Sequence, residues 1–296
     1  MTGNDSPCLV ISSARSGSKL LRALLMESGV FNCYPYDINY IWMRSFSDRD
    51  NDELELSDVR PGDVEFIRRY FDKLLKDRSN SGNRVLEKTV SNGLRLEYVC
   101  KTLPGAQVIH LVRDGRDVTA SIQSCWKTTR YSSKNQDKKL MFQKLMNFPF
   151  FHSTPYLIKY LKNSVSGLSD KASLGSWGPR YSGMEDMMRE NTLVEVCATQ
   201  WARSIDRTRD GLHSGSIVEP YLEVKYEELV SNSEVTIERI ASFLNLNNVK
   251  DMISWGESNI TSSTSGWANL SEEEQHLAWP IIEKNMRIYG LSLIHI

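Results

Sequence analysis

Two short segments, residues 8–11 (CLVI) and 107–112 (QVIHLV), are almost continuously apolar. Each is followed by a loop of small or charged residues and then by a segment whose apolar residues recur at helical spacing. Strands that lack polar alternation and alternate with helices are typical of a mainly parallel sheet covered on both faces. Residues 84–88 and 221–224 are two further strand candidates. The sequence therefore predicts an α/β fold with a central, mainly parallel sheet flanked by helices.

Apolar spacing and helix-ending residues predict the helices. They are expected over residues 19–28, 65–76, 93–102, 192–209, 233–244 and 272–289, with another that begins at Asp117. Pro280 is expected to kink or split the last of these helices. Residues 127–193 interrupt the alternation and mix basic, aromatic and turn-forming residues. We expect one domain over residues 1–296, with residues 127–193 inserted as a substrate lid.

The 296 residues include 36 Lys and Arg against 37 Asp and Glu, so the formal net charge is −1. This balance argues against a nucleic-acid or general polyanion binder. The sequence contains no run of 18 apolar residues, so it predicts no membrane span. The start of the chain lacks the features of a signal peptide. Five cysteines without a C-x-x-C pair predict reduced thiols and no zinc site. We expect a cytoplasmic protein, and the sequence does not indicate its oligomeric state.

Residues 13–19 (SARSGSK) follow the first predicted strand and open the first helix. Backbone N–H groups and the positive end of the helix dipole make such a helix start favourable for an anion. Gly17 permits close backbone approach, Ser16 and Ser18 offer hydroxyl donors, and two cations flank them, Arg15 and Lys19. The alternative is an ordinary strand–helix turn. Leu20 stands where a Walker A loop has its magnesium-binding Ser or Thr, which disfavours a magnesium–ATP kinase.

A second loop with the same setting follows residues 107–112 and reads RDGRDVTAS over residues 113–121. Arg113 ends the predicted strand, and Ser121 lies about two helical turns further on. Arginine offers a bidentate fork that suits a phosphate. Ligands of parallel sheets bind at the carboxyl ends of the strands, and both loops lie there. Two anion sites predict a ligand that has phosphate groups at both ends.

Both loops resemble those of the sulfotransferases that use 3′-phosphoadenosine 5′-phosphosulfate (PAPS). The resemblance rests on residues 14–20 (ARSGSKL), 86–89 (LEKT), 113–121, 224–229 (VKYEEL) with 243–244 (FL), and 265–267 (SGW). It is closer to the bacterial and tyrosylprotein branches than to the small-molecule enzymes of animal cytosol. It implies PAPS as the sulfuryl donor, 3′,5′-ADP as the product, and no metal.

The resemblance also implies roles for individual residues. Arg15, Ser16, Gly17, Ser18, Lys19 and Leu20 would cradle the 5′-phosphosulfate. Arg113 and Ser121 would hold the 3′-phosphate, Tyr226 would approach the nucleotide, and Ser265 would close over it. The structural alternatives are an ordinary first-turn lysine for Lys19, an ion pair for Lys88 and a core-edge tyrosine for Tyr226.

Sulfuryl transfer needs cations at the reacting oxygens and a base for the acceptor proton. Arg15, Lys19 and Lys88 are the candidate catalytic cations. Asp37 lies among tyrosines in residues 33–40 (CYPYDINY), and desolvation by such neighbours favours a base, so Asp37 is our candidate. His110 and His152 are its rivals, and a surface-turn aspartate is the structural alternative.

We therefore expect a sulfotransferase that acts on a hydroxyl or amine of a small metabolite or natural product. The aromatic and cationic residues of 127–193, Lys127 among them, suit a small polar or anionic acceptor. A P-loop nucleotide kinase-like enzyme and a non-catalytic 3′,5′-ADP-binding protein are the alternatives.

Overall fold

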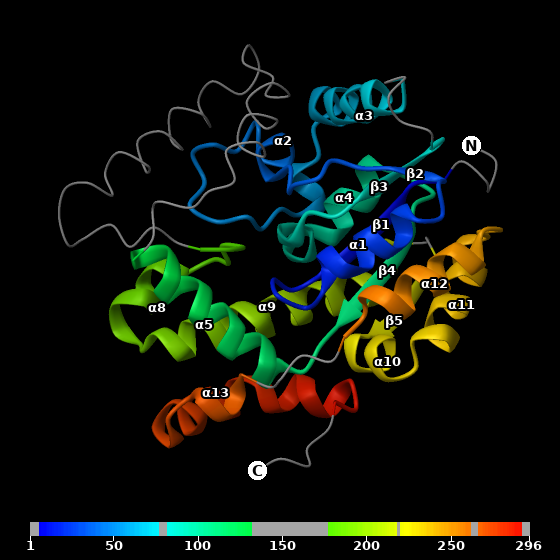
Figure 1. Ribbon diagram of the computed structural model, residues 1–296. Helices are drawn as coiled ribbons and strands as arrows, with labels where there is room; N and C mark the ends of the chain where they lie inside the picture. The colour runs from blue at the N-terminus through cyan, green and yellow to red at the C-terminus, as the bar shows by residue number, and fades with distance from the viewer. Residues whose placement is uncertain (1–5, 77–81, 132–176, 218–219, 262–265, 292–296) are drawn as a thin grey trace.

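A computed structural model describes residues 6–76, 82–131, 177–217, 220–261 and 266–291 of the chain. At its centre is a five-stranded sheet in the order β2-β3-β1-β4-β5, and all four neighbouring pairs are parallel (Figure 1). The strands are β1 (Cys8–Ser12), β2 (Phe31–Asn32), β3 (Arg84–Glu87), β4 (Gln107–Val112) and β5 (Tyr221–Lys225). The predicted α/β fold with a parallel sheet is therefore confirmed.

The helices follow the strands along the chain. They are α1 (Ser18–Met26), α2 (Asn39–Trp42), α3 (Pro61–Lys76), α4 (Leu96–Thr102), α5 (Gly115–Tyr131), α8 (Met184–Glu190), α9 (Leu193–His213), α10 (Tyr226–Ser231), α11 (Ser233–Leu244), α12 (Val249–Asn259) and α13 (Glu272–Ile288). Short 3₁₀ turns are η1 (Leu56–Asp58), η2 (Val90–Arg95) and η3 (Trp267–Asn269).

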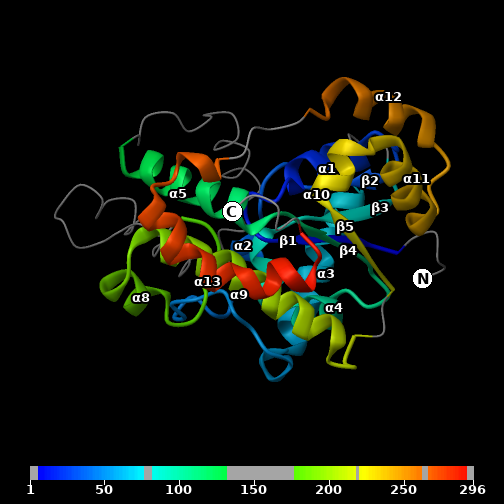
Figure 2. The same ribbon diagram turned by 90° about the horizontal axis from the view of Figure 1, so that it is seen from below.

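Alternate residues of β1 point into two different cores. Cys8 and Val10 pack with buried residues of α1, α11 and α12 on one face of the sheet. Leu9 and Ile11 pack with α3 and α4 on the other face. On this second side α9 also contacts α5 and α13, and Figure 2 shows α13 lying along α9. The burial of both faces explains why the strand sequences lack polar alternation.

The register of β1 places two loops side by side. β1 pairs with β3 on one edge and with β4 on the other, and Leu9 lies opposite both Glu87 and Val108. Because the strands are parallel, their carboxyl ends meet at one edge of the sheet. The loop after β1 and the loop after β4 are therefore neighbours, as the sequence predicted.

The structure differs from the predicted elements in three places. Pro280 lies inside α13 without splitting it. Proline has no backbone N–H, so the carbonyl oxygen of His276, four residues earlier, lacks its helical donor. Both residues are exposed, and water can therefore donate a hydrogen bond to that oxygen. The helix expected over 93–102 is a 3₁₀ turn followed by α4. β2, α2, α8, α10 and α12 were not predicted. Of residues 127–193, the stretch 132–176 lies outside the described residues, and so does His152.

Candidate functional site

The loop between β1 and α1 has an unusual backbone. Arg15 and Gly17 have φ angles of 67° and 91°, so two of three consecutive residues are left-handed. For Arg15 this conformation costs roughly 1 kcal/mol. The hydroxyls of Ser13 and Ser16 hydrogen-bond at 2.5 Å inside the loop, and both serines are buried. Internal hydrogen bonding of this kind fixes the loop before any ligand binds.

Tyr226 lies directly against this loop. A Cβ built at Gly17 would come within 2.5 Å of Cδ2 and 2.7 Å of Cε2 of the Tyr226 ring, so no side chain fits there. On the same ring lies the guanidinium of Arg113, 4.2 Å from its centroid. Three residues that the sequence assigned to the nucleotide, Gly17, Arg113 and Tyr226, are thus in contact.

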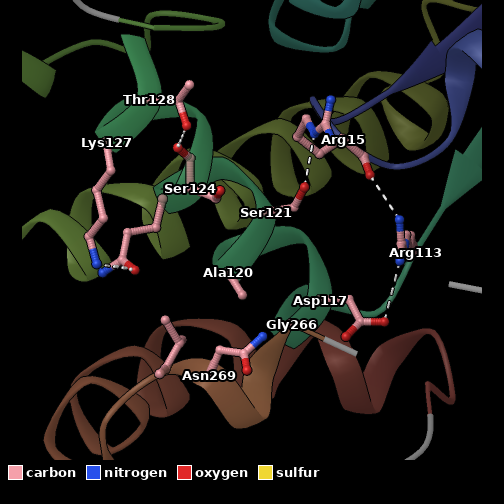
Figure 3. A pocket seen from close by; sticks show the side chains of 12 residues that line it. Arg15, Arg113, Asp117, Ala120, Ser121, Ser124, Lys127, Thr128, Gly266 and Asn269 are labelled. Atoms are coloured by element: carbon pink, nitrogen blue, oxygen red, sulfur yellow. Dashed lines mark hydrogen bonds and ion pairs between the residues drawn. The ribbon is translucent and has the colours of Figure 1, made fainter. Parts of the chain in front are cut away.

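The two loops are joined by hydrogen bonds across about 100 residues of sequence. Nε of Arg15 donates to Oγ of Ser121 at 2.9 Å, and Nη1 of Arg113 donates to the carbonyl oxygen of Arg15 at 3.3 Å (Figure 3). Arg113 also pairs with Asp117, 3.4 Å between Nη2 and Oδ2. The structure therefore brings both predicted anion loops into one site.

A cavity of about 500 Å³ opens at this junction. One wall is a face of α5, and the opposite wall comes from Gly266, Asn269 and Leu270 (Figure 3). Three cations and one carboxylate line it, so the lining is positively charged overall. The lining residues are Arg15, Arg113, Asp117, Ala120, Ser121, Gln123, Ser124, Lys127, Thr128, Gly266, Asn269 and Leu270.

Neighbouring elements hold the loop after β4 in place. Nε1 of Trp201 in α9 donates to the carbonyl oxygen of Arg113 at 3.2 Å. A Cβ at Gly115 would lie 2.8 to 2.9 Å from the Trp201 ring. Oε1 of Glu227 accepts from the backbone N–H of Asp114 at 2.9 Å, and burial raises the pKa of Glu227. Asp114 in turn pairs with Arg116 at 2.5 Å.

Lys88 and Asp37 form an ion pair just beyond the end of β3. Nζ of Lys88 lies 2.6 Å from Oδ1 of Asp37, and the side chains are 4% and 33% exposed. Behind them the buried Glu87 accepts from Nε1 of Trp42 and from Nδ2 of Asn92, each at 3.0 Å. Burial raises the pKa of Glu87. The candidate cation and the candidate base are therefore adjacent, but neither lines the described cavity.

The remaining predicted residues fall in different places. Lys19 and Leu20 lie on the first turn of α1 and do not line the cavity, and Lys19 is exposed. Ser265 lies outside the described residues, although Gly266 beside it lines the cavity. His110 is fully buried in β4, where burial lowers its pKa to about 3. This rival for the base is therefore a neutral core residue.

The sequence analysis missed several cavity residues, among them Asp117, Ser124 and Thr128. Together with the predicted Ser121 they recur at intervals of three and four along α5, which places them on one helical face. That spacing was a readable signal, since a helix was predicted to begin at Asp117. Lys127, which the sequence assigned to the acceptor insertion, lines the same cavity as Arg113.

Within the described ranges, no three His, Cys, Asp or Glu side chains are grouped as metal ligands would be. None of the helices in this part of the chain is long and apolar enough to cross a bilayer.

Known sulfotransferases share features of the sequence and the fold of this chain. The model of the sulfotransferase family matches residues 7–147. The fold is similar to the sulfotransferase domain from the curacin biosynthetic pathway, at 14% identity and a TM-score of 0.51 over 98% of this chain and 99% of that chain. It is also similar to sulfotransferase STF9 from Mycobacterium avium, at 13% identity and a TM-score of 0.55 over 98% of this chain and 78% of that chain. No curated protein matches by sequence. The chain therefore matches the sulfotransferase family over residues 7–147, and its fold is similar to that of sulfotransferases of known structure.

Proposed function

We propose that this protein transfers the sulfuryl group of PAPS to a hydroxyl or amine of a small metabolite or natural product. The observation that carries the proposal is the contact between the two anion loops. Arg15 reaches Ser121, and Arg113 reaches the backbone of Arg15, at the edge of one cavity. A nucleotide with phosphate groups at both its 5′ and 3′ positions suits two anion loops that meet in this way.

In this proposal, the first loop binds the 5′-phosphosulfate through Arg15 and through the backbone of residues 16–20. Arg113 and Ser121 bind the 3′-phosphate, because arginine forks and hydroxyls are suited to phosphate oxygens. Tyr226, held between Gly17 and Arg113, packs against the nucleotide between the two anionic groups. Ser265 is proposed to bind the nucleotide as well, because the 265–267 segment (SGW) resembles that of the family.

The reaction is an in-line displacement. The acceptor oxygen or nitrogen forms a bond to sulfur, while the bond from sulfur to the 5′-phosphate oxygen breaks and 3′,5′-ADP leaves with that electron pair. Asp37 takes the acceptor proton, and Lys88, 2.6 Å from Asp37, stands beside it as a cation for the transferring group. Arg15 and Lys19 supply positive charge at the leaving phosphate, so that no metal is required.

We further propose that residues 1–296 form one domain and that residues 127–193 contribute the acceptor site. The cationic, aromatic composition of 127–193 supports a small polar or anionic acceptor.

The test compares two nucleotides by thermal unfolding. Stabilisation by 3′,5′-ADP without magnesium supports the proposal, whereas stabilisation by ATP and magnesium alone would favour a kinase-like enzyme. Turnover of PAPS with a library of hydroxylated and aminated metabolites then separates catalysis from binding. Release of 3′,5′-ADP that depends on one of these acceptors is the expected result, and binding without turnover of any of them would indicate a non-catalytic protein.

A further inference from the structure

A buried arginine is hydrogen-bonded to the two segments that carry Asp37 and Lys88. Arg95 is only 1% exposed, and a buried guanidinium needs acceptors for its N–H groups. Nε of Arg95 donates to Oδ1 of Asn92 at 3.0 Å, and Nη2 donates to Oδ1 of Asn39 at 2.5 Å. Both acceptors are amide oxygens, so each asparagine has its NH₂ group free to donate on the other side.

Each asparagine continues the chain of hydrogen bonds to a buried carboxylate. Nδ2 of Asn92 donates to Oε1 of Glu87 at 3.0 Å, and Nδ2 of Asn39 donates to Oδ1 of Asp52 at 2.8 Å. The carbonyl oxygen of Asp52 also accepts from Nη1 of Arg95 at 3.4 Å. Each amide therefore has one favourable orientation, because reversing it would place its NH₂ group against an N–H of Arg95.

Asp52 joins this chain to the segment that follows the masked part of residues 127–193. The backbone N–H of Arg180 donates to Oδ2 of Asp52 at 2.9 Å, and the backbone N–H of Asp52 donates to the carbonyl oxygen of Arg180 at 2.7 Å. Oδ2 of Asp52 also accepts from Oγ of Ser91 at 3.0 Å. The adjacent Glu53 accepts from the backbone N–H of Ser182 at 3.1 Å. The backbone of residues 180–182 is thus attached to the core through Asp52 and its neighbour.

The same chain of hydrogen bonds fixes the segment that carries Asp37. Asn39 lies two residues after Asp37. Between them the backbone N–H of Ile38 donates at 3.0 Å to Oγ1 of Thr89, the residue after Lys88. These bonds restrict the backbone on both sides of the Asp37–Lys88 pair, so a displacement of Asn39 changes the direction of the Asp37 carboxylate.

Resting on the proposed function, we infer that Asp52 is a positioning residue for sulfuryl transfer. Through Asn39 it orients the segment that carries the proposed base, Asp37. Through Arg180 it attaches the segment that is proposed to contribute the acceptor site. Asp52 does not line the cavity assigned to the nucleotide, so its role is to align the base with the acceptor and not to bind the donor.

The test compares Asp52→Asn with the wild type in two measurements. The first is the steady-state release of 3′,5′-ADP from PAPS with the library metabolite that the wild type turns over fastest. The second is the titration of 3′,5′-ADP. The variant should lower kcat about tenfold or more, because a displacement of about 1 Å at a reacting group can cost this much. Its affinity for 3′,5′-ADP should equal that of the wild type.

An exchange of the two side chains makes the test specific. Asparagine at position 52 has one acceptor oxygen, so its NH₂ group must face either Asn39 or the donors of Ser91 and Arg180. In Asp52→Asn/Asn39→Asp, the oxygen at position 52 accepts from those donors and its NH₂ group donates to the carboxylate at position 39. That carboxylate also accepts from Arg95, and the net charge is unchanged. The double variant should therefore regain most of the kcat that Asp52→Asn loses, which a role separate from Asn39 would not predict.

Asp63→Asn is the matched control. Asp63 is also a buried aspartate, but it lies on α3, where it accepts from Oγ of Ser45 at 2.6 Å and lies 3.6 Å from Nε of Arg44. At a temperature where thermal unfolding shows it to be folded, this variant should have the kcat of the wild type.

The outcomes are distinguishable. Wild-type kcat in Asp52→Asn, a loss of kcat matched by a loss of 3′,5′-ADP affinity, or an inactive or unfolded double variant would overturn the inference and leave the proposed function intact. If Asp52→Asn alone does not fold, the double variant decides: wild-type-like kcat supports the inference, and a large loss overturns it. A wild type that turns over no acceptor of the library would overturn the proposed function and this inference with it.

Discussion

A methyl group at Gly17 would collide with the Tyr226 ring, because the two are already in contact. Gly17→Ala combines this clash with a left-handed φ of 91° and should lower the free energy of unfolding by roughly 2–3 kcal/mol. Gly29→Ala is the matched control, since Gly29 also has a positive φ but nothing within 4 Å of its Cβ. It should lose only about 1 kcal/mol. Urea denaturation measures both, and equal losses would contradict the packing of Tyr226 on Gly17.

His110 makes stability depend on pH. Between pH 6.5 and about 3 the unfolded chain binds a proton at His110 that the folded chain does not bind. Stability should therefore fall as the pH drops through this window, by up to roughly 1.4 kcal/mol per pH unit for this group. His110→Leu removes the contribution and should flatten the pH dependence between pH 6.5 and 4.5 in urea denaturation. An unchanged slope would show that His110 is protonated in the folded state.

Removing one member of the Asp37–Lys88 pair leaves the other without its countercharge. Lys88 is only 4% exposed, so Asp37→Asn should lower the free energy of unfolding by about 1–2 kcal/mol, a figure reduced because Asp37 is one-third exposed. The double variant Asp37→Asn/Lys88→Met should recover part of this loss. Additive losses in denaturation experiments would mean that the two charges do not interact.

At the residue scale, the sequence indicated which residue types gather but not their contacts. The bond from Arg15 to Ser121 joins positions 106 apart, and no local pattern encodes it. The pairing of Lys88 with Asp37 across 51 positions was not predicted either, because no local pattern links the two residues. Such contacts are created when strands that are distant in sequence become neighbours in the sheet.

At the scale of elements, α9 supports the loop that presents Arg113. Gly115→Ala places a methyl group within 3 Å of the Trp201 ring, whose indole N–H holds the Arg113 carbonyl. We expect the variant to weaken 3′,5′-ADP binding about threefold or more, as displaced Trp201 shifts Arg113. Titration calorimetry measures this effect. Gly105→Ala has a positive φ but open space around its Cβ, so it should leave binding unchanged. Wild-type affinity in Gly115→Ala would show that α9 does not position Arg113.

The elements themselves were predicted unevenly. β4 and α11 have the expected bounds, because a continuous apolar strand and an amphipathic helix are strong local signals. β2 has only two residues and is defined by its pairing with β3. A segment of two residues is too short to show a recognisable pattern of apolar and polar residues, so it could not be predicted. Pro280 failed to split α13 because the helix presents it to solvent.

For the whole molecule, the near-neutral net charge hides a local concentration of cations. Arg15, Arg113 and Lys127 line one cavity of a chain whose formal charge is −1. Net charge alone predicts no polyanion partner, whereas the positions of Arg15 and Arg113 at the carboxyl ends of β1 and β4 are what favour a doubly phosphorylated nucleotide.

The most direct test of this account is titration calorimetry of the wild type and of Arg113→Ala with 3′,5′-ADP in the absence of magnesium. Arg189→Ala, which removes an exposed arginine of α8, is the control. We predict binding by the wild type and the control, and at least a tenfold loss of affinity in Arg113→Ala. Undiminished binding by Arg113→Ala, or a wild type that binds ATP with magnesium but not 3′,5′-ADP, would contradict the account.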